Sequence, residues 1–265
     1  MEYREMGRQQ APFDQAASAY DETFTDSTIG KEQRKRVYHW LNQANFPKKG
    51  QRIFEINCGT GADAAYFHQK GIKIKATDGS PEMIEVARSS RDQAIDFSVL
   101  DFSKVDQTTI IGEAIFSNFG GLNCLSEIEL KQLFQRISVA QNSGDLLAVV
   151  IMPRFCFMEG LYFFTRLKWS KLFRRNTSKG LPVNVDGKDV LTYYHSPRAV
   201  QKMLPDYSIQ LKKPVAICLP PSYLEPFFAK RPRFLKLLSA LEKNLGRISL
   251  FSGWSDHYIL IAEKK

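Results

Sequence analysis

Three residues around a short glycine loop have the types and spacing needed to bind a nucleoside. Gly59 and Gly61 follow an apolar run, and Asp78 comes seventeen positions after Gly61. Glycines at such a turn remove side chains where backbone N–H groups must approach a ligand closely. An aspartate at the tip of the next strand can accept hydrogen bonds from two ribose hydroxyls. The pattern therefore predicts a site for a ligand that contains a nucleoside.

Glu55 helps to decide between two ligands of this kind. The spacing Gly59-x-Gly61-x-x-Ala64 also satisfies the dinucleotide pattern G-x-G-x-x-G/A. A carboxylate just before the turn would repel a pyrophosphate, but it would favour a ligand with an ammonium or sulfonium centre. S-adenosylmethionine has both centres, so Glu55 favours this cofactor over a nicotinamide dinucleotide.

With these residues in place, the sequence resembles the class I S-adenosylmethionine-dependent methyltransferases, in particular their small-molecule branch of quinone and polyketide type. The resemblance covers roughly residues 10–150 and the two closing strands. Glu55 to Gly61, with Cys58 inside, stand where the family has its E-x-G-x-G-x-G loop, and Asn57 replaces the first glycine. Asparagine tolerates a left-handed backbone better than most residues.

The resemblance also assigns residues beyond the loop to the cofactor site. Asp78 matches the ribose-binding acid, and three neighbours would line the adenine side: Gly79, Ser80 and Met83. The segment Val99–Phe102 matches the part of the family whose acid accepts from the adenine amino group, which implies roles for Asp101 and Phe102.

Two further segments are implied to lie near the transferred methyl group. Phe116–Asn123, with Asn118 and Phe119, stands at the tip of the fourth strand, and it lacks the N-P-P-Y form of enzymes that methylate base amino groups. The segment from Phe13 to Asp21 looks like the part of quinone-type methyltransferases in which a tyrosine, here Tyr20, closes over the cofactor. An aromatic residue that only packs is an equal alternative for Tyr20.

The elements that must position these residues alternate between strand and helix. Strands are predicted at residues 52–57, 72–77, 96–100, 114–117 and 145–152, and helices at 62–70, after Ser80 and at 126–140. Ser80 is the expected N-cap of its helix, because Pro81 follows it at the first helical position. This α/β alternation predicts a sheet with helices on both faces. The resemblance makes it Rossmann-like and seven-stranded, with the last strand antiparallel.

The chain is expected to have four parts. An N-terminal helical segment (1–50) precedes the S-adenosylmethionine-binding core (51–153). An inserted lid (154–195) follows, with a hairpin that turns at Asp186-Gly187. Residues 196–265 complete the sheet with strands at 208–218 and 257–263, and they include a helical insertion at 219–250.

Charge is distributed unevenly between these parts. Residues 1–153 have 17 Lys and Arg against 20 Asp and Glu, whereas residues 154–250 have 18 against 6. An anionic substrate, an anionic membrane surface or a nucleic acid would each fit the basic part, and so would a solvated face without a partner.

The lid composition indicates the acceptor class. Its aromatic residues, with prolines in the later insertion, favour a roofed apolar pocket for a small lipophilic or acidic metabolite. We expect in-line methyl transfer, with O-methylation favoured and no metal. His195, after Tyr193-Tyr194, is the best candidate for a general base, although a structural histidine is as plausible. His257 is expected to pack.

Other classes remain open at this point. An RNA or protein methyltransferase could use residues 154–250, and a non-catalytic protein could bind S-adenosylmethionine or NAD. The absence of recognised RNA-reading modules makes a nucleic-acid partner less favoured, and a transient contact with a membrane surface is expected. No apolar run reaches membrane-spanning length, residues 1–13 lack a signal-like apolar region, and the four cysteines are not paired by spacing, so a cytoplasmic location is expected.

Overall fold

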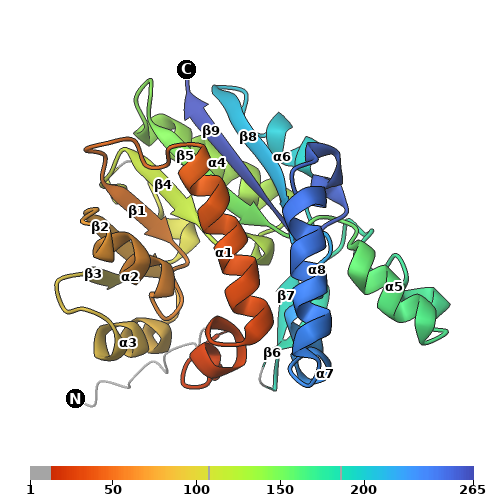
Figure 1. Ribbon diagram of the computed structural model, residues 1–265. Coiled ribbons are helices and arrows are strands. Elements are labelled where there is room, and N and C mark those ends of the chain that lie inside the picture. The colour runs from red at the N-terminus through yellow and green to blue at the C-terminus, as the bar shows by residue number, and fades with distance from the viewer. Residues whose placement is uncertain (1–12, 107, 186) are drawn as a thin grey trace, which may run out of the picture.

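The computed structural model describes residues 13–106, 108–185 and 187–265, and it contains a seven-stranded sheet with helices on both faces (Figure 1). The strand order is β3-β2-β1-β4-β5-β9-β8. The strands are β1 (Ile53–Ile56), β2 (Ile74–Asp78), β3 (Asp96–Val99), β4 (Ala114–Ser117), β5 (Leu146–Ile151), β8 (Tyr207–Val215) and β9 (His257–Lys264). The predicted strands are confirmed to within a few residues.

The first five of these strands are parallel, and β9 runs antiparallel between β5 and β8. This order confirms the predicted Rossmann-like sheet with an antiparallel last strand. The antiparallel direction also has a consequence for the site. The start of β9, at His257, lies at the same edge of the sheet as the carboxyl ends of β1, β2 and β4.

Helices cover the two faces of the sheet with separate apolar clusters. On one face lie α1 (Thr28–Gln43), α2 (Ala62–Gln69) and α3 (Pro81–Ser90), whose buried residues pack with Ile53, Ala76 and Phe116. On the other face lie α4 (Glu127–Ala140) and α6 (Pro197–Lys202), which pack with Phe54, Ile115 and Leu147. Because side chains alternate along each strand, Glu55 and His257 belong to the face that α1 covers.

Serine caps begin the helices where the sequence predicts them. The Ser80 hydroxyl accepts a hydrogen bond from the N–H of Met83 at the start of α3. Ser126 begins α4 with a complete capping box, in which the Glu129 side chain accepts from the N–H of Ser126. A capped helix start is held in register, so the loop that precedes it is positioned as well.

The second part of the chain adds a hairpin and several helices to the sheet. The predicted hairpin pairs β6 (Leu181–Val185) with β7 (Lys188–Thr192), and Asp186 of its predicted turn lies outside the described residues. The helices are α5 (Phe157–Thr165), α7 (Glu225–Phe228) and α8 (Pro232–Leu245). Shorter helical turns are η1 (Asp21–Thr25), η2 (Phe102–Lys104), η3 (Gly121–Cys124), η4 (Trp169–Lys171), η5 (Ser222–Leu224) and η6 (Ser249–Gly253). Within the described parts of the chain, no helix has both the length and the apolar character needed to cross a bilayer.

The aromatic residues after position 154 differ from the sequence-based expectation. Phe164, Trp169 and Phe173 are 51%, 54% and 65% exposed, so they do not line a roofed pocket. The reason is that α5 extends away from the sheet at the right of Figure 1 and has few elements to pack against. By contrast, Phe163 of the same helix is buried.

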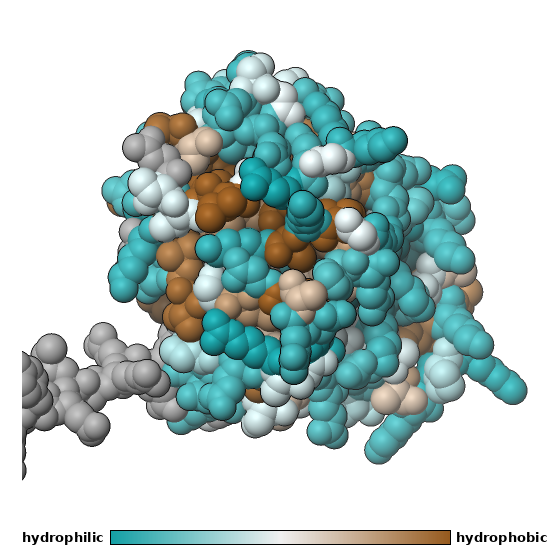
Figure 2. Space-filling model, turned by 90° about the vertical axis from the view of Figure 1, so that its left-hand side faces the viewer, coloured by the Kyte–Doolittle hydropathy of each residue, from teal (hydrophilic) through white to brown (hydrophobic). Residues whose placement is uncertain are grey.

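Figure 2 shows the side of the molecule that lies at the left of Figure 1, away from α5, where β3 is the edge strand of the sheet. Hydrophobic residues gather near the middle of this side, and hydrophilic residues surround them. The exposed large apolar residues in this part of the chain include Val99 and Ile111. Apolar residues within a mostly polar surface are usual for a folded protein.

Candidate active site

The glycine loop after β1 has the left-handed backbone that its residues predict. Asn57, Gly59 and Gly61 have φ angles of 54°, 54° and 76°. A Cβ at Gly61 would lie 2.6 Å from the Phe97 ring, so this position has no room for a side chain. Asparagine is among the few other residues that adopt this backbone readily, which explains how Asn57 can replace a glycine.

Asp78 is held at the tip of β2 by two backbone N–H groups. Gly59 donates to Oδ2 at 2.9 Å, and Ser80 donates to Oδ1 at 2.8 Å. Burial raises the pKa of Asp78, although the bonds from Ser80 and Gly59 oppose this shift. Each carboxylate oxygen keeps a further acceptor site, so two hydroxyls of a ribose could bind side by side.

Glu55 is buried directly before the loop without a hydrogen-bond partner. Its side chain is fully buried, and neither oxygen is bonded to any described residue. Burial and the nearby charge of Asp63 raise the pKa of Glu55 well above its usual range, while Arg34 opposes the shift and Asp78 adds to it. Three acids therefore surround one cation, and this imbalance favours a positively charged ligand.

A network that the sequence analysis missed joins the loop to the tip of β4. Arg34 pairs with Asp63 at 2.5 Å, and Asn118 donates to the same carboxylate at 3.0 Å. Asn57 donates to the Asn118 backbone carbonyl at 2.7 Å, a bond that a glycine could not make. The sequence held one signal for this network, since Asp63 lies in the first turn of the helix after the loop.

The segment before α1 lies over the glycine loop. The Tyr20 ring comes within 3.8 Å of the position that a Cβ on Gly59 would take. Asp21 accepts from the Thr60 hydroxyl and pairs with Arg91, each at 2.5 Å. We call these three residues the Asp21 clamp. Burial raises the pKa of Tyr20 to about 12, so its hydroxyl stays protonated.

The other predicted cofactor residues occupy different surroundings. Ser80 and Met83 lie beneath the N-terminal segment, where Met83 packs with Ala16 and Ala17. Gly79 is exposed. Asp101 is exposed. It lies near the end of β2, since the N–H of the preceding residue, Leu100, donates to the Asp78 carbonyl. Two predicted residues are turned toward the protein: Cys58, which is buried with a raised thiol pKa, and Phe102, which packs against the α4 face.

Beyond β4, an aromatic pair leads from the loop to a histidine and a carboxylate. The Phe119 ring contacts Phe24 and His257 edge-on, with centroids 5.2 Å and 5.3 Å apart. His257 Nδ1 lies 3.2 Å from Oδ2 of Asp256, but this contact lacks hydrogen-bond geometry. This imidazole is buried next to the β4 tip, where it packs against Phe119 as the sequence suggested.

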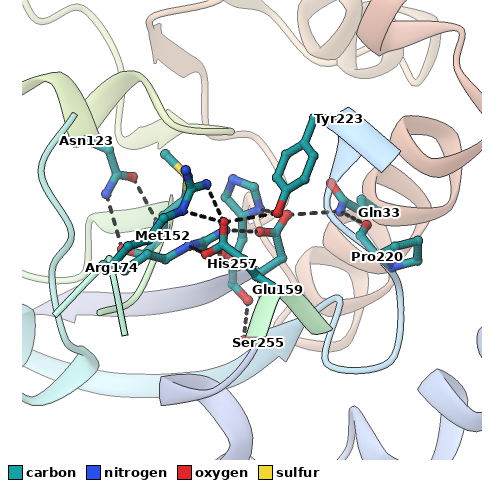
Figure 3. A network of polar contacts seen from close by, with 11 residues as sticks. Gln33, Asn123, Met152, Glu159, Arg174, Pro220, Tyr223, Ser255 and His257 are labelled. Atoms are coloured by element: carbon teal, nitrogen blue, oxygen red, sulfur yellow. Dashed lines mark hydrogen bonds and ion pairs between the residues drawn. The ribbon is translucent and has the colours of Figure 1, made fainter. Parts of the chain in front are cut away.

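Asp256 is fixed by a buried network that reaches α5 (Figure 3). It accepts from Arg175 at 2.8 Å and from Gln33 at 3.2 Å. Arg175 also pairs with Glu159 of α5 at 2.5 Å, and Arg174 pairs with the same carboxylate. Burial alone would raise the pKa of Asp256, but His257 and Arg175 hold it well below its usual range. Asp256 is therefore an anion next to the imidazole.

His195, the candidate base from the sequence, lies elsewhere. Its side chain is buried, and Nε2 donates to the Leu125 carbonyl at 3.0 Å, since a carbonyl can only accept. Its backbone bonds to Met152 and to the Tyr258 hydroxyl. Burial lowers the pKa of His195. These contacts join the hairpin to the sheet, and none of them reaches the glycine loop, so the geometry favours a structural histidine here.

Known proteins share both the core of this chain and its fold. A family model described as a methyltransferase domain matches residues 53–144. The demethylmenaquinone methyltransferase of Clavibacter sepedonicus is 32% identical over 116 residues, which are 43% of this chain and 46% of that protein. The chain thus matches about half the length of this curated relative.

Two solved structures match nearly the whole fold at low sequence identity. The CcbJ methyltransferase from Streptomyces caelestis has a TM-score of 0.59 at 12% identity, over 97% of this chain and 99% of that chain. The magnesium protoporphyrin IX methyltransferase from Synechocystis PCC 6803, solved with bound SAH, has a TM-score of 0.56 at 13% identity, over 94% and 98%. At such identities the likeness concerns the fold.

Together, the sheet and the glycine loop have the form found in class I S-adenosylmethionine-dependent methyltransferases. More particularly, residues 53–144 form a methyltransferase domain, and S-adenosylmethionine is its cofactor. The residues present fit this cofactor. Glu55 offers a buried carboxylate that lacks a partner, Asp78 offers two oxygens for a ribose, and the Tyr20 ring lies against Gly59.

Proposed function

We propose that this protein transfers a methyl group from S-adenosylmethionine to an oxygen atom of a small, lipophilic or acidic metabolite. The observation that carries the proposal is the unpaired carboxylate of Glu55 at the glycine loop. A buried carboxylate without a partner is costly, and it is retained where a ligand supplies the missing charge. A dinucleotide would bring phosphates to this position, whereas S-adenosylmethionine brings an ammonium and a sulfonium group.

In this proposal, the described residues mainly align the reactants and exclude water. S-adenosylmethionine, when bound, supplies a methyl carbon on a sulfonium leaving group. Asp78 would hold the ribose, and Tyr20 would cover the loop while the Asp21 clamp keeps it in place. For an in-line displacement, such alignment is a large part of catalysis.

The acceptor side supports a lipophilic substrate. Phe24 and Phe119 form an aromatic wall next to the loop. The partly matched relative from Clavibacter sepedonicus is named for its action on demethylmenaquinone, a quinone. An aromatic wall suits a flat, apolar ring of this kind. We therefore place phenols and hydroquinones first among the acceptors to be tested.

We further propose His257, rather than His195, as the general base. In the proposed tautomer, a small rotation of the ring would let Nδ1–H donate to the nearby Asp256 carboxylate, which leaves the lone pair on Nε2. The carboxylate would orient the ring and stabilise the imidazolium that forms after proton transfer, as an aspartate does in Ser-His-Asp sites. An acceptor hydroxyl next to Phe119 would lie within reach of this ring.

The proposed partner is a small molecule, and a nucleic-acid acceptor has less support. Arg174 and Arg175 belong to the basic part of the chain, but both are paired with Glu159 and are not available to phosphates. The four cysteines are free thiols. Free thiols are typical of a reducing compartment, so we propose a cytoplasmic location.

Calorimetric titration with S-adenosylmethionine, its demethylated product and NAD tests the cofactor. We expect Glu55→Gln to weaken S-adenosylmethionine binding by about 2 kcal/mol, roughly thirtyfold, because a charge-assisted contact is lost. The matched control is Glu85→Gln, which changes an exposed glutamate on α3 and should leave binding unchanged.

The pH dependence of the titration provides a second readout. The pKa of Glu55 is raised in the free protein, and a bound cation would lower it. Binding should therefore release a proton and tighten as pH rises through the free-protein pKa of Glu55. Glu55→Gln should lose this pH dependence. Tighter binding of NAD than of S-adenosylmethionine, improved further by Glu55→Gln, would overturn the proposal.

A further inference from the structure

Exposed apolar side chains are concentrated in one part of the described chain. Among its large, exposed apolar residues, sixteen lie between Phe157 and Trp254, and only four precede them: Val99, Ile111, Ile128 and Val139. Single exposed apolar residues are normal, but a group of them indicates a contact surface. The second part of the molecule therefore presents such a surface.

The most prominent part of this surface is the end of α5 and the turn that follows. The eight consecutive residues 164–171 are all exposed. They include Phe164 and Trp169, whose rings meet edge-on at 5.0 Å, and Leu167, which is 72% exposed. Figure 1 shows that α5 and the turn after it stand away from the sheet. We call residues 161–173 the α5 tip.

The charges of the α5 tip have one sign. Residues 160–185 contain six Lys and Arg and no Asp or Glu. Arg174 and Arg175 point inward to Glu159, whereas Arg166, Lys168 and Lys171 are exposed among the apolar side chains. Aromatic and aliphatic residues interleaved with cations are the composition of segments that lie in a membrane interface. A nucleic-acid surface does not need the exposed leucines.

We propose that the α5 tip is a docking surface for an anionic lipid membrane. Leu167, Trp169 and Phe173 would enter the headgroup region, and the neighbouring cations would lie near lipid phosphates. Glu159 of α5 and Asp256 both pair with Arg175, so the helix that carries the α5 tip is connected to the proposed acceptor side of the site. The contact does not depend on the proposed function, but its use in delivering a lipophilic acceptor rests on it.

Vesicle co-sedimentation of the full chain tests the contact. We expect the protein to bind vesicles of phosphatidylcholine with about one quarter phosphatidylglycerol, and to bind pure phosphatidylcholine about tenfold less, because the cations contribute. The triple variant L167S/W169S/F173S should bind the anionic vesicles at least about tenfold less. The matched control, I128S/V139S, removes two residues that are each 72% exposed on α4, and it should bind like the wild type.

Tryptophan fluorescence locates the contact within the tip. The chain has three tryptophans, of which Trp40 is buried while Trp169 and Trp254 are about half exposed. Brominated lipids should quench the wild type, and Trp169→Phe should lose most of this quenching while Trp254→Phe keeps it. Equal quenching in Trp169→Phe, or equal sedimentation of the triple variant, would overturn the proposal.

The same experiments separate this proposal from other partners and from the proposed function. Retention of the protein by DNA or RNA in place of vesicles, or self-association that the triple variant abolishes without vesicle binding, would also overturn it. Binding of S-adenosylmethionine is measured without lipid. Loss of vesicle binding with intact cofactor binding therefore identifies failure of the docking surface alone, and the reverse result identifies failure of the cofactor assignment.

Discussion

Buried acids lie in two regions of the molecule, and the regions differ in whether these acids have hydrogen-bond or ion-pair partners. Glu55, in the part before residue 154, has no hydrogen bond from any described residue. Asp256 and Glu159, in the later part, share Arg175 between them, and Gln33 donates to Asp256 as well. All three of these acids are almost fully buried, so burial does not distinguish the two regions.

The difference shows which acids support the fold and which are available to a ligand. A buried ion pair with all its partners present holds segments together. An acid without a partner keeps its acceptor sites for something that the protein chain does not provide. On this basis the Arg175 network joins α5 to Asp256, and we propose that the unpaired Glu55 binds the ligand together with Asp78, which keeps further acceptor sites.

Removal of Arg175 should have the largest effect on the fold. Arg175→Met leaves Asp256 and Glu159 as buried acids with less compensation, so we expect a loss of about 3–5 kcal/mol in the free energy of unfolding. Urea or thermal denaturation measures it. The matched control is Arg166→Met, an exposed cation of the α5 tip, which should change stability by less than about 0.5 kcal/mol.

The Arg175 network should also affect how the free energy of unfolding depends on pH in the acidic range. Because the folded-state pKa of Asp256 is depressed, its contribution is present above its unfolded pKa of about 4 and is lost as pH falls toward the folded value. Asp256→Asn should therefore lose stability at neutral pH and show a weaker dependence on pH below about 4. An Arg175→Met protein as stable as the wild type would show that the network is not a support of the fold.

His257 should affect turnover more than binding. With an acceptor from the phenol and hydroquinone screen, we expect His257→Gln to lower kcat about 100-fold, the scale of general-base catalysis. The Kd for S-adenosylmethionine should not change, and the acid limb of the kcat pH profile should disappear. His195→Gln is the companion variant. If it lowers kcat more than His257→Gln does, then His195 is the base.

Asp78 should affect binding rather than turnover. Asp78→Asn keeps one acceptor oxygen but turns an amide NH2 toward a backbone N–H, so we expect S-adenosylmethionine binding to weaken by about 2 kcal/mol. Calorimetry measures the change, with the exposed Asp96→Asn on β3 as its control. Unchanged affinity would mean that the ribose binds elsewhere and that Asp78 only fixes the loop.

The smallest effect is expected at the α5 tip. Leu167→Ser should change the free energy of unfolding by less than about 0.5 kcal/mol, because its side chain is 72% exposed and has little packing to lose. A chemical denaturation curve measures this. A loss above about 2 kcal/mol would be typical of a packed residue, and it would mean that the tip folds back against the body.

Short-range patterns predicted the first part of the chain well. The capped start at Ser80, the helix predicted at 126–140, the alternating strands and the glycine loop each depend on residues that are close in sequence. The resemblance predicts that Tyr20 closes over the cofactor, and in the structure its ring lies against Gly59. The roles proposed for these residues at the cofactor remain predictions.

The missed residues depend on contacts between distant parts of the chain. Arg34 meets Asp63 from another helix, and Asp256 meets Arg175 across 81 positions. The sequence predicts the strand that begins at His257 and its antiparallel direction, but no local pattern shows that this imidazole lies next to Phe119. The exposure of Trp169 was missed for a related reason, because an apolar stretch alone does not show whether another element covers it.

The position of β9 has a consequence for the order in which the molecule can be built. Residues 257–264 form an inner strand of the sheet, between β5 and β8, although β5 ends at Ile151. During synthesis, β5 therefore exposes an unpaired edge until more than a hundred further residues have been made. An open apolar edge is prone to pairing with other chains. The yield of folded protein should therefore depend more on how fast β9 docks, and on chaperones that protect the edge until then, than on the folding of the cofactor-binding core.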